Sequence, residues 1–424
     1  MDKLKLMKRK SSRDKDDEDD DEFGDFEELD HMLTNTRFLV EYEFFQVLGQ
    51  GSFGTVHLVK AKTRSKVFFS ALKVMDKKVY IDSKHVEKAD RERALLMEAR
   101  SCKYITKLFD ALQFQNKFCL ELEFINGSDL WTVQNNRPDK KTVCFTTKQT
   151  RYILGQVFLA LKFLHERDII YRDLKTENIL VDYKWRVKLT DFGFAKKLEG
   201  DKRTATLCGT PDYMAPEILL HKWYTFAIDW WSFGILVYEL VAGQTPFAEH
   251  EVDSKKYRAI VEDRVKYPSF FKSNLISLLE GLLKKSPSER LGHMKLRSMD
   301  IYNHYWWSNV WYDLENNKNS LYYTSKLPSV LKVKAVEAFP ELPKGLFEDR
   351  SARLSQEEFE AFASFRCVDT HSDYYKNKDK NNALKKITMQ IGQLNTHEGD
   401  EENRSKLRKI TDKGNNEPDL MEVM

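Results

Sequence analysis

The sequence predicts an α+β fold of two lobes, with a small β-rich N-terminal lobe and a larger helical C-terminal lobe. Residues 44–74 contain three short runs of β-branched and aromatic residues broken by glycines, which predict antiparallel strands, and a further strand is expected at 118–124. One charged, amphipathic helix is expected at 84–100. Long helical patterns dominate the later part of the chain, notably at 152–165 and 228–242. This order of elements predicts a ligand-binding cleft between the lobes.

The two ends of the chain differ in composition from its middle. Residues 1–22 and 367–424 are highly charged and are expected to be disordered, because they cannot bury enough apolar surface to offset the entropy of ordering. Residues 23–43 carry apolar side chains at helical spacing, which predicts a docking helix and a lead-in to the main domain. The main domain is placed at 44–305, and a separate tail at 306–366.

Composition argues against several classes of protein. The formal net charge is only +3 over 424 residues, so no nucleic acid partner is expected. No stretch approaches the roughly 20 consecutive apolar residues of a membrane helix, so no membrane span is expected. The five cysteines show neither metal-ligand spacing nor pairing, which is typical of a reducing compartment and indicates a cytoplasmic or nuclear location.

A glycine-rich run at 49–54 follows the first predicted strand. Glycines at this spacing let backbone N–H groups approach a phosphate closely, because no Cβ intervenes. A dinucleotide-binding turn has the same spacing, but a helix follows it, whereas strand residues 55–59 follow here. The run is therefore expected to form a hairpin lid over a nucleotide, and a dinucleotide oxidoreductase is disfavoured.

A lysine and a glutamate follow this run on different elements. Lys73 lies on the third predicted strand among apolar neighbours, and Glu92 lies on the helix at 84–100. Such a cation and carboxylate can pair and hold the α- and β-phosphates of a nucleotide. An ordinary surface lysine is the alternative, and the next segment decides between the two.

Residues 171–178 and the Asp191-Phe192-Gly193 triplet contain the groups needed for phosphoryl transfer. Asp173 can accept the proton of a substrate hydroxyl, and Lys175 can neutralise charge on the transferred group. Asn178 and Asp191 offer oxygen ligands, which together with nucleotide phosphates suit Mg²⁺.

In this order and spacing, these residues resemble the signature set of eukaryotic protein kinases over 44–305. Tyr171, in place of the usual histidine, and the run 207–217 are typical of the AGC group, and the closest resemblance within it is to the catalytic subunit of cAMP-dependent protein kinase. The resemblance implies a bilobal kinase fold with one regulatory helix and ATP in the cleft. It also implies serine/threonine kinase activity with ATP and Mg²⁺, and an AGC-type tail at 306–366.

The same resemblance implies roles for individual residues. The backbone of Glu123 and Ile125 would pair with adenine, and Asp129 would bind the ribose. The expected catalytic residues are Asp173, Lys175, Lys73 and Glu92, and Asn178 and Asp191 are the expected metal ligands. The expected cofactor-binding residues are Leu48, Gly49, Gln50, Gly51, Ser52, Phe53, Gly54, Val56, Ala71, Lys73, Glu123, Ile125, Asp129, Glu177, Asn178, Leu180 and Asp191.

Two internal anchors of the large lobe also follow from the resemblance. Asp229 and Arg290 match internal anchors of the large lobe, and Arg290 is expected to pair with Glu217.

Thr206 matches the activation-loop phosphorylation site of the family. A phosphate there, added by an upstream kinase or by autophosphorylation, would pair with Arg172, Lys196 and Lys88 and order the loop. The alternative is that these are three unrelated surface cations.

Substrate and partner expectations rest on matching acidic positions. Asp129, Glu177 and Glu239 match carboxylates that receive arginines before the target hydroxyl, which implies protein substrates with basic residues before Ser or Thr. Ser12 follows Arg9 and Lys10 and is a candidate autophosphorylation site. No cyclic-nucleotide-binding domain is recognised, so such control would need a separate regulatory or inhibitory subunit.

The sequence departs from the family pattern in three places. Thr176 replaces the usual proline of the catalytic loop, which costs rigidity but no catalytic group. Residues 136–147 form a longer insertion than usual, expected to be an exposed loop. Residues 359–365 resemble the family's hydrophobic motif in two registers, and both stay open. A pseudokinase scaffold is the alternative function, and it is disfavoured because every metal and base group is present.

Overall fold

The computed structural model describes ten stretches of the chain. One compact unit comprises Glu43–Lys60 and Phe68–Thr370 and holds the candidate site. The other comprises Met1–Tyr42, Ala61–Val67 and His371–Met424, of which few residues are described. The predicted N-terminal docking helix, Ser12 and the hydrophobic motif therefore lie outside the described residues. These are 41–51, 54–62, 67–83, 85–113, 116–135, 145–182, 184–200, 203–249, 253–293 and 298–316.

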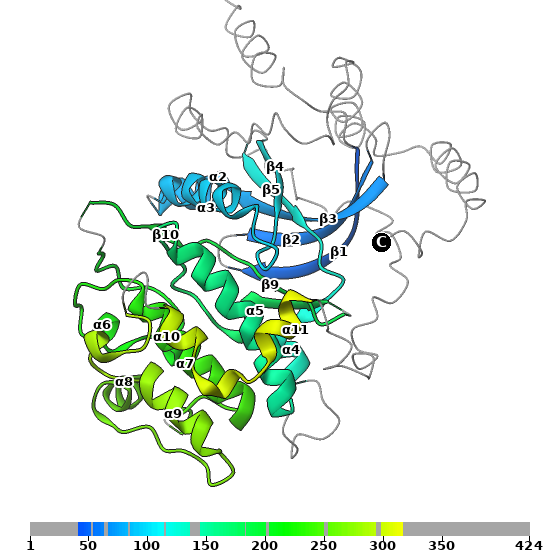
Figure 1. Cartoon of the computed structure of the whole chain (residues 1–424). Coiled ribbons are helices and arrows are strands. Elements are labelled where there is room, and N and C mark those ends of the chain that lie inside the picture. The colour runs from blue at the N-terminus through cyan, green and yellow to red at the C-terminus, as the bar shows by residue number, and fades with distance from the viewer. Residues whose placement is uncertain are drawn as a thin grey trace, which may run out of the picture. The chain divides into compact units, whose positions relative to one another are not determined.

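The N-terminal lobe is built on a five-stranded sheet of order β1-β2-β3-β5-β4 (Figure 1). The three strands predicted between residues 44 and 74 and the strand predicted at 118–124 are confirmed, whereas β4 was not predicted. The strands are β1 Glu41–Gly51, β2 Gly54–Lys62, β3 Val67–Asp76, β4 Leu108–Gln113 and β5 Lys117–Glu123.

The described part of this lobe contains two helices. Helix α2 covers Lys77–Asp82, and the Asp76 carboxylate caps its start by accepting a hydrogen bond from the Lys78 amide. Helix α3 covers Val86–Ala99, which confirms the predicted helix and places Glu92 among its buried residues.

The C-terminal lobe is helical, as predicted. A capping box fixes the start of α5: the Thr146 side chain accepts from the Gln149 amide, and the Gln149 side chain accepts from the Thr146 amide. The helices are α4 Leu130–Asn135, α5 Thr147–His165, α6 Pro216–Leu219, α7 Ala227–Ala242, α8 Asp253–Glu262, α9 Ser273–Leu282, α10 Ser298–Tyr302 and α11 Val310–Glu315.

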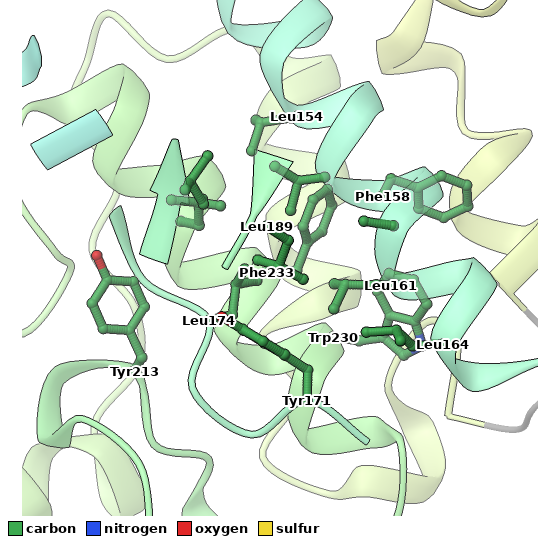
Figure 2. Packing of buried hydrophobic residues seen from close by; sticks show 14 of the residues in the cluster. Leu154, Phe158, Leu161, Leu164, Tyr171, Leu174, Leu189, Tyr213, Trp230 and Phe233 are labelled. Carbon is green, nitrogen blue, oxygen red and sulfur yellow. The ribbon is translucent and has the colours of Figure 1, made fainter. Parts of the chain in front are cut away.

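An aromatic cluster joins α5 to α7 (Figure 2). The Phe158 ring lies 5.5 Å from Trp230 and 6.4 Å from Phe233, measured between ring centroids. All three side chains are buried. Each large apolar side chain of this kind contributes about 1.5–3 kcal/mol by leaving water. The cluster therefore stabilises the packing of α5 against α7.

Short strands position the loops between the lobes. One sheet has the order β6-β8-β9, and another pairs β10 with β7. The described residues of this lobe also form four 3₁₀ turns: η2 Thr176–Asn178, η3 Pro211–Tyr213, η4 Pro287–Glu289 and η5 Tyr305–Trp307. The strands are β6 Gly127–Asp129, β7 Ile169–Ile170, β8 Ile179–Asp182, β9 Val187–Leu189 and β10 Lys196–Lys197.

The two-lobed α+β fold predicted from the sequence is confirmed by this arrangement. In the part of the chain that the structure describes, no helix combines the length and apolar character needed to cross a membrane.

Candidate active site

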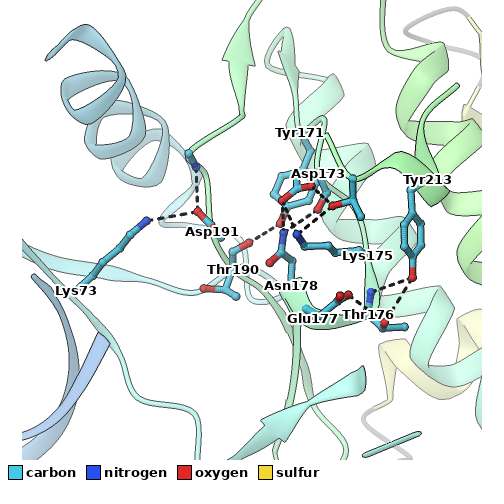
Figure 3. A network of polar contacts seen from close by, with 12 residues as sticks. Lys73, Tyr171, Asp173, Lys175, Thr176, Glu177, Asn178, Thr190, Asp191 and Tyr213 are labelled. Atoms are coloured by element: carbon cyan, nitrogen blue, oxygen red, sulfur yellow. Dashed lines mark hydrogen bonds and ion pairs between the residues drawn. The ribbon is translucent and has the colours of Figure 1, made fainter. Parts of the chain in front are cut away.

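Lys73 of β3 is held between two carboxylates. Its Nζ lies 2.7 Å from Glu92 Oε1 on α3 and 3.4 Å from Asp191 Oδ1, a pair of contacts that joins the two lobes (the Lys73–Asp191 contact is drawn in Figure 3). Burial alone would lower the pKa of Lys73, but the negative charges of Glu92 and Asp191 raise it above its ordinary value. The positive charge of Lys73 in turn lowers the pKa of Asp191. The site therefore keeps a charged lysine beside an ionised aspartate.

The Asp173 carboxylate is buried and oriented by three side chains, of which Asn178 and Lys175 are labelled in Figure 3. Asn178 Nδ2 donates to Asp173 Oδ2 at 2.8 Å, and Thr210 Oγ1 donates to Asp173 Oδ1 at 3.0 Å. Lys175 Nζ lies 3.3 Å from Asp173 Oδ2 and also donates to Thr210 Oγ1 at 3.0 Å. A carboxylate fixed in this way can accept a proton from a hydroxyl placed beside it.

A buried aspartate holds the backbone that carries Asp173. Asp229 accepts hydrogen bonds from the amides of Tyr171 and Arg172 at 2.9 and 2.8 Å, and His165 Nε2 lies 2.8 Å from the same carboxylate. Arg172 has a φ of 69°, an unfavourable region for a non-glycine residue. These bonds hold the catalytic loop in that strained conformation, consistent with the predicted anchoring role of Asp229.

The predicted pairing of Arg290 with Glu217 is present. Arg290 NH1 lies 2.7 Å from Glu217 Oε1, and Arg290 NH2 lies 2.9 Å from Glu217 Oε2. Both residues are buried, and this two-point geometry is the strong form of the ion pair. It ties α6, at the end of the activation segment, to the segment that follows η4.

Strands β1 to β3, β5, β6 and β8 carry many of the predicted nucleotide-binding residues, while Glu177 and Asn178 lie on η2. Ala71 faces Leu122 across the β3–β5 pair, and Leu180 faces Asp129 across the β6–β8 pair. A Cβ on Gly54 would lie 2.3 Å from the Val74 carbonyl oxygen, so only glycine fits there.

The glycine-rich run itself is only partly described. Leu48, Gly49, Gln50 and Gly51 are exposed on β1, and Val56 on β2 is half-buried. Ser52 and Phe53 lie outside the described residues.

Two of the nucleotide-binding candidates already have polar partners. The Glu123 carboxylate at the end of β5 pairs with Lys188 Nζ at 2.7 Å, and Ile125 follows in the segment between β5 and β6. The Asp129 carboxylate accepts from the Thr132 amide at 2.8 Å and from its hydroxyl at 2.7 Å. A ribose would therefore share Asp129 with the first turn of α4.

The candidate metal ligands fit a magnesium site completed by phosphates. Because Asn178 donates through Nδ2, its carbonyl oxygen is the atom suited to a cation. The Asp191 side chain is 45% exposed and thus accessible to a ligand. Among the described residues no group of three or more His, Cys, Asp or Glu could hold a metal. Two protein ligands with the nucleotide are what Mg²⁺ commonly uses.

Glu177 of η2 and Glu239 of α7 form a second acidic centre, which was only partly predicted. Tyr213 donates from its phenol to Glu239 Oε2 of α7, and Thr176 contacts the same phenol. Burial, together with the nearby charge of Glu177, raises the pKa of Glu239 to about 7. Thr210 and Tyr213 both lie in the 207–217 run that is typical of the AGC group, and this was the only sign of them in the sequence. Their contacts with the catalytic loop were not predicted.

The predicted phosphate-binding cations lie around the activation segment. Arg172 Nε donates to the Phe194 carbonyl at 2.6 Å, and Lys196 Nζ donates to Thr204 Oγ1 at 3.2 Å. Burial lowers the pKa of Lys88, and the charges of Arg91 and Arg172 lower it further. The structure thus places Lys88 within the electrostatic reach of Arg172.

Thr206 itself is exposed, and its carbonyl accepts from the Tyr224 hydroxyl at 2.6 Å.

Comparison with known proteins identifies the family. Residues 42–307 match the protein kinase domain, so the chain belongs to the protein kinase family. It is 39% identical over 272 residues to cAMP-dependent protein kinase type 3 of Saccharomyces cerevisiae, covering 64% of this chain and 66% of that protein. It is also 38% identical over 321 residues to cAMP-dependent protein kinase catalytic subunit 2 of Drosophila melanogaster. That match covers 75% of this chain and 86% of the Drosophila protein.

A third relative comes from another branch. Protein kinase C eta type of Mus musculus is 38% identical over 264 residues, which cover 62% of this chain and 37% of that protein. These relatives place the chain in the AGC group of serine/threonine kinases.

Proposed function

We propose that this chain transfers the γ-phosphoryl group of ATP to serine or threonine hydroxyls of proteins. The observation that carries the proposal is the Asp173 carboxylate, held by Asn178, Thr210 and Lys175. Asp173 accepts the proton of the substrate hydroxyl as its oxygen attacks the γ-phosphorus and the bond to the β-phosphate oxygen breaks.

The remaining charges support the same reaction. Lys73, fixed by Glu92, holds the α- and β-phosphates, and Lys175 neutralises charge on the transferred group. Asn178 and Asp191 would hold Mg²⁺, which neutralises phosphate charge when bound.

The proposed substrates carry arginines before the target hydroxyl. Glu177 is exposed beside the catalytic loop, and Glu239 lies close enough for the charge of Glu177 to affect its pKa. Carboxylates bind guanidinium groups directionally, so arginine is favoured over lysine. A separate regulatory subunit is proposed only by analogy with the relatives named as catalytic subunits.

A positional-scanning peptide library with labelled ATP and Mg²⁺ tests this function. We expect phosphate on Ser or Thr peptides with arginine two and three residues earlier, and none with Asp191→Ala, which removes a metal ligand. The Glu177→Gln and Glu239→Gln variants should each weaken arginine selection. Selection of acidic or proline-directed peptides by the unmodified protein would contradict the proposed substrate class.

Full activity is further proposed to need phosphate on Thr206. A phosphate there would draw Arg172, Lys196 and Lys88 together and order the segment. Thr206→Ala should lower kcat/KM roughly tenfold or more, since a single charge-assisted hydrogen bond contributes about 1.5–3 kcal/mol. The comparison requires unmodified protein whose phosphorylation has been confirmed by mass spectrometry. Equal rates for the two proteins would refute the requirement.

A further inference from the structure

A continuous chain of hydrogen bonds links an exposed and a buried carboxylate beside the catalytic loop. Thr176 Oγ1 lies 3.2 Å from Glu177 Oε2 and 3.4 Å from the Tyr213 hydroxyl (Figure 3). The Thr176 amide also points to the Tyr213 hydroxyl at 3.4 Å. Tyr213 in turn donates to Glu239. The order of the chain is therefore Glu177, Thr176, Tyr213, Glu239.

The proton count fixes the direction of these bonds. The Tyr213 phenol has one proton, which it gives to Glu239, so its oxygen must act as the acceptor toward Thr176. The Thr176 hydroxyl also has one proton, which it directs to Glu177 or to Tyr213. Thr176 is thus a donor in this chain twice: its amide points to Tyr213, and its hydroxyl donates to one of the two partners.

A proline at position 176 could make neither contact, because it has no N–H and no hydroxyl. Thr176 is 1% exposed and Tyr213 is 6% exposed, so water cannot easily take the place of these hydrogen-bond donors. The substitution of threonine for proline therefore adds two donors at the base of the acidic centre.

We propose that Thr176 is a positioning residue for arginine selection, which holds the Tyr213 phenol and the Glu177 carboxylate so that Glu177 and Glu239 act on the substrate together. This inference rests on the proposed function, because it concerns how the substrate arginine is bound. Thr176 acts through its neighbours and touches neither ATP nor the reacting hydroxyl.

The charges around Glu239 should make arginine selection depend on pH. Glu177 of η2 and Asp212 of η3 raise the pKa of Glu239, and Asp212 is itself paired with Lys256 of α8 at 2.9 Å. The bonds from Tyr213 and Thr176 oppose that rise. Since an acid is charged above its pKa, arginine selection should grow as the pH rises through about 7. Loss of the Thr176 hydroxyl should shift the pH at which arginine selection increases to a higher value.

The test measures binding, so that it does not depend on turnover. Two peptides carry alanine at the target position, one with arginine and the other with glutamine two and three residues before it. Their Kd values are measured by fluorescence anisotropy between pH 6 and 9 for the full chain. Thr176→Val removes the hydroxyl while keeping the shape, and Thr176→Ser restores the hydroxyl. Thr150→Val is the matched control, since its buried hydroxyl has no hydrogen-bond partner among the described residues.

We expect Thr176→Val to reduce about fivefold the ratio of the Kd for the glutamine peptide to the Kd for the arginine peptide, the loss expected for one hydrogen bond. The pH midpoint of this ratio should rise, and Thr176→Ser should restore both quantities. The inference is overturned if Thr176→Val keeps the original ratio, if it weakens both peptides equally, or if Thr150→Val has the same effect.

Two further outcomes separate this inference from the proposed function. If the unmodified protein does not discriminate between the peptides, the basic substrate class and the role of Thr176 both fail. If the binding ratios behave as expected but serine versions of the peptides receive no phosphate from ATP, the phosphoryl-transfer function fails and the role of Thr176 stands.

Discussion

Replacing Lys73 with methionine should lower kcat roughly 100- to 1,000-fold, the loss typical of removing one electrostatic contact to the reacting group. The Lys73 ammonium lies 2.7 Å from Glu92 and 3.4 Å from Asp191, so one cation is shared by both lobes. Its loss removes the charge that binds the α- and β-phosphates and releases the restraint on the Asp191 carboxylate. Steady-state kinetics with ATP and a peptide substrate measure the effect.

The folded state should survive this substitution. Glu92 is 3% exposed, and burial already raises its pKa, so it can take up a proton once Lys73 is gone. Circular dichroism of the Lys73→Met protein should therefore match that of the unmodified protein. Lys117→Met is a control of the same chemistry on the same sheet, because Lys117 pairs with Asp76 away from the Asp173 cluster. Near-normal turnover in Lys73→Met would refute the role of this lysine.

The elements with strong local patterns were predictable from the sequence. The helices α3, α5 and α7 have clear helical periodicity, and β1 to β3 are rich in β-branched and aromatic residues. Strand β4 was missed because its sequence, Leu-Phe-Asp-Ala-Leu-Gln, shows no alternation and contains Asp110 and Ala111, which are uncommon in strands. Its pairing with β5 creates this strand, and no local window contains that pairing.

Residues at the site were predictable where the chemistry requires a particular side chain. Lys73, Glu92 and Asp191 were expected to act together, and the structure places them in contact. The contacts of Thr210 with Asp173 and of Tyr213 with Glu239 depend on how the activation segment folds back on the catalytic loop, far away in sequence.

Thr176 shows the limit of reasoning from a family pattern. From the sequence, its replacement of proline was expected to cost rigidity and to remove no catalytic group. The structure instead places its side chain within hydrogen-bonding distance of Glu177 and Tyr213. Glu239 was expected to meet a substrate arginine, and the structure shows that Tyr213 of η3 donates a hydrogen bond to it.

Replacing Asp173 with asparagine should lower kcat roughly 100- to 10,000-fold, the range expected for loss of a general base. The amide keeps the size of the carboxylate but cannot accept a proton from the substrate hydroxyl. Its carbonyl oxygen can still accept from Asn178 Nδ2, which donates to Asp173 Oδ2 at 2.8 Å, when its NH₂ group faces the Thr210 hydroxyl. Single-turnover kinetics with bound ATP isolate this chemical step from product release.

Nucleotide binding separates the base role of Asp173 from a structural one. Asp173 is 3% exposed and is surrounded by Thr210, Lys175 and Asn178, none of which needs to move for an asparagine to fit. The Kd of ATP should therefore change less than threefold in Asp173→Asn, a shift of under about 0.7 kcal/mol, while the chemical step slows. Thr210→Val removes the hydroxyl that donates to Asp173 Oδ1 and keeps Asp173 itself. It therefore tests whether the orientation of the carboxylate matters for the chemical step. If Asp173→Asn turned over as fast as the unmodified protein, Asp173 could not be the base.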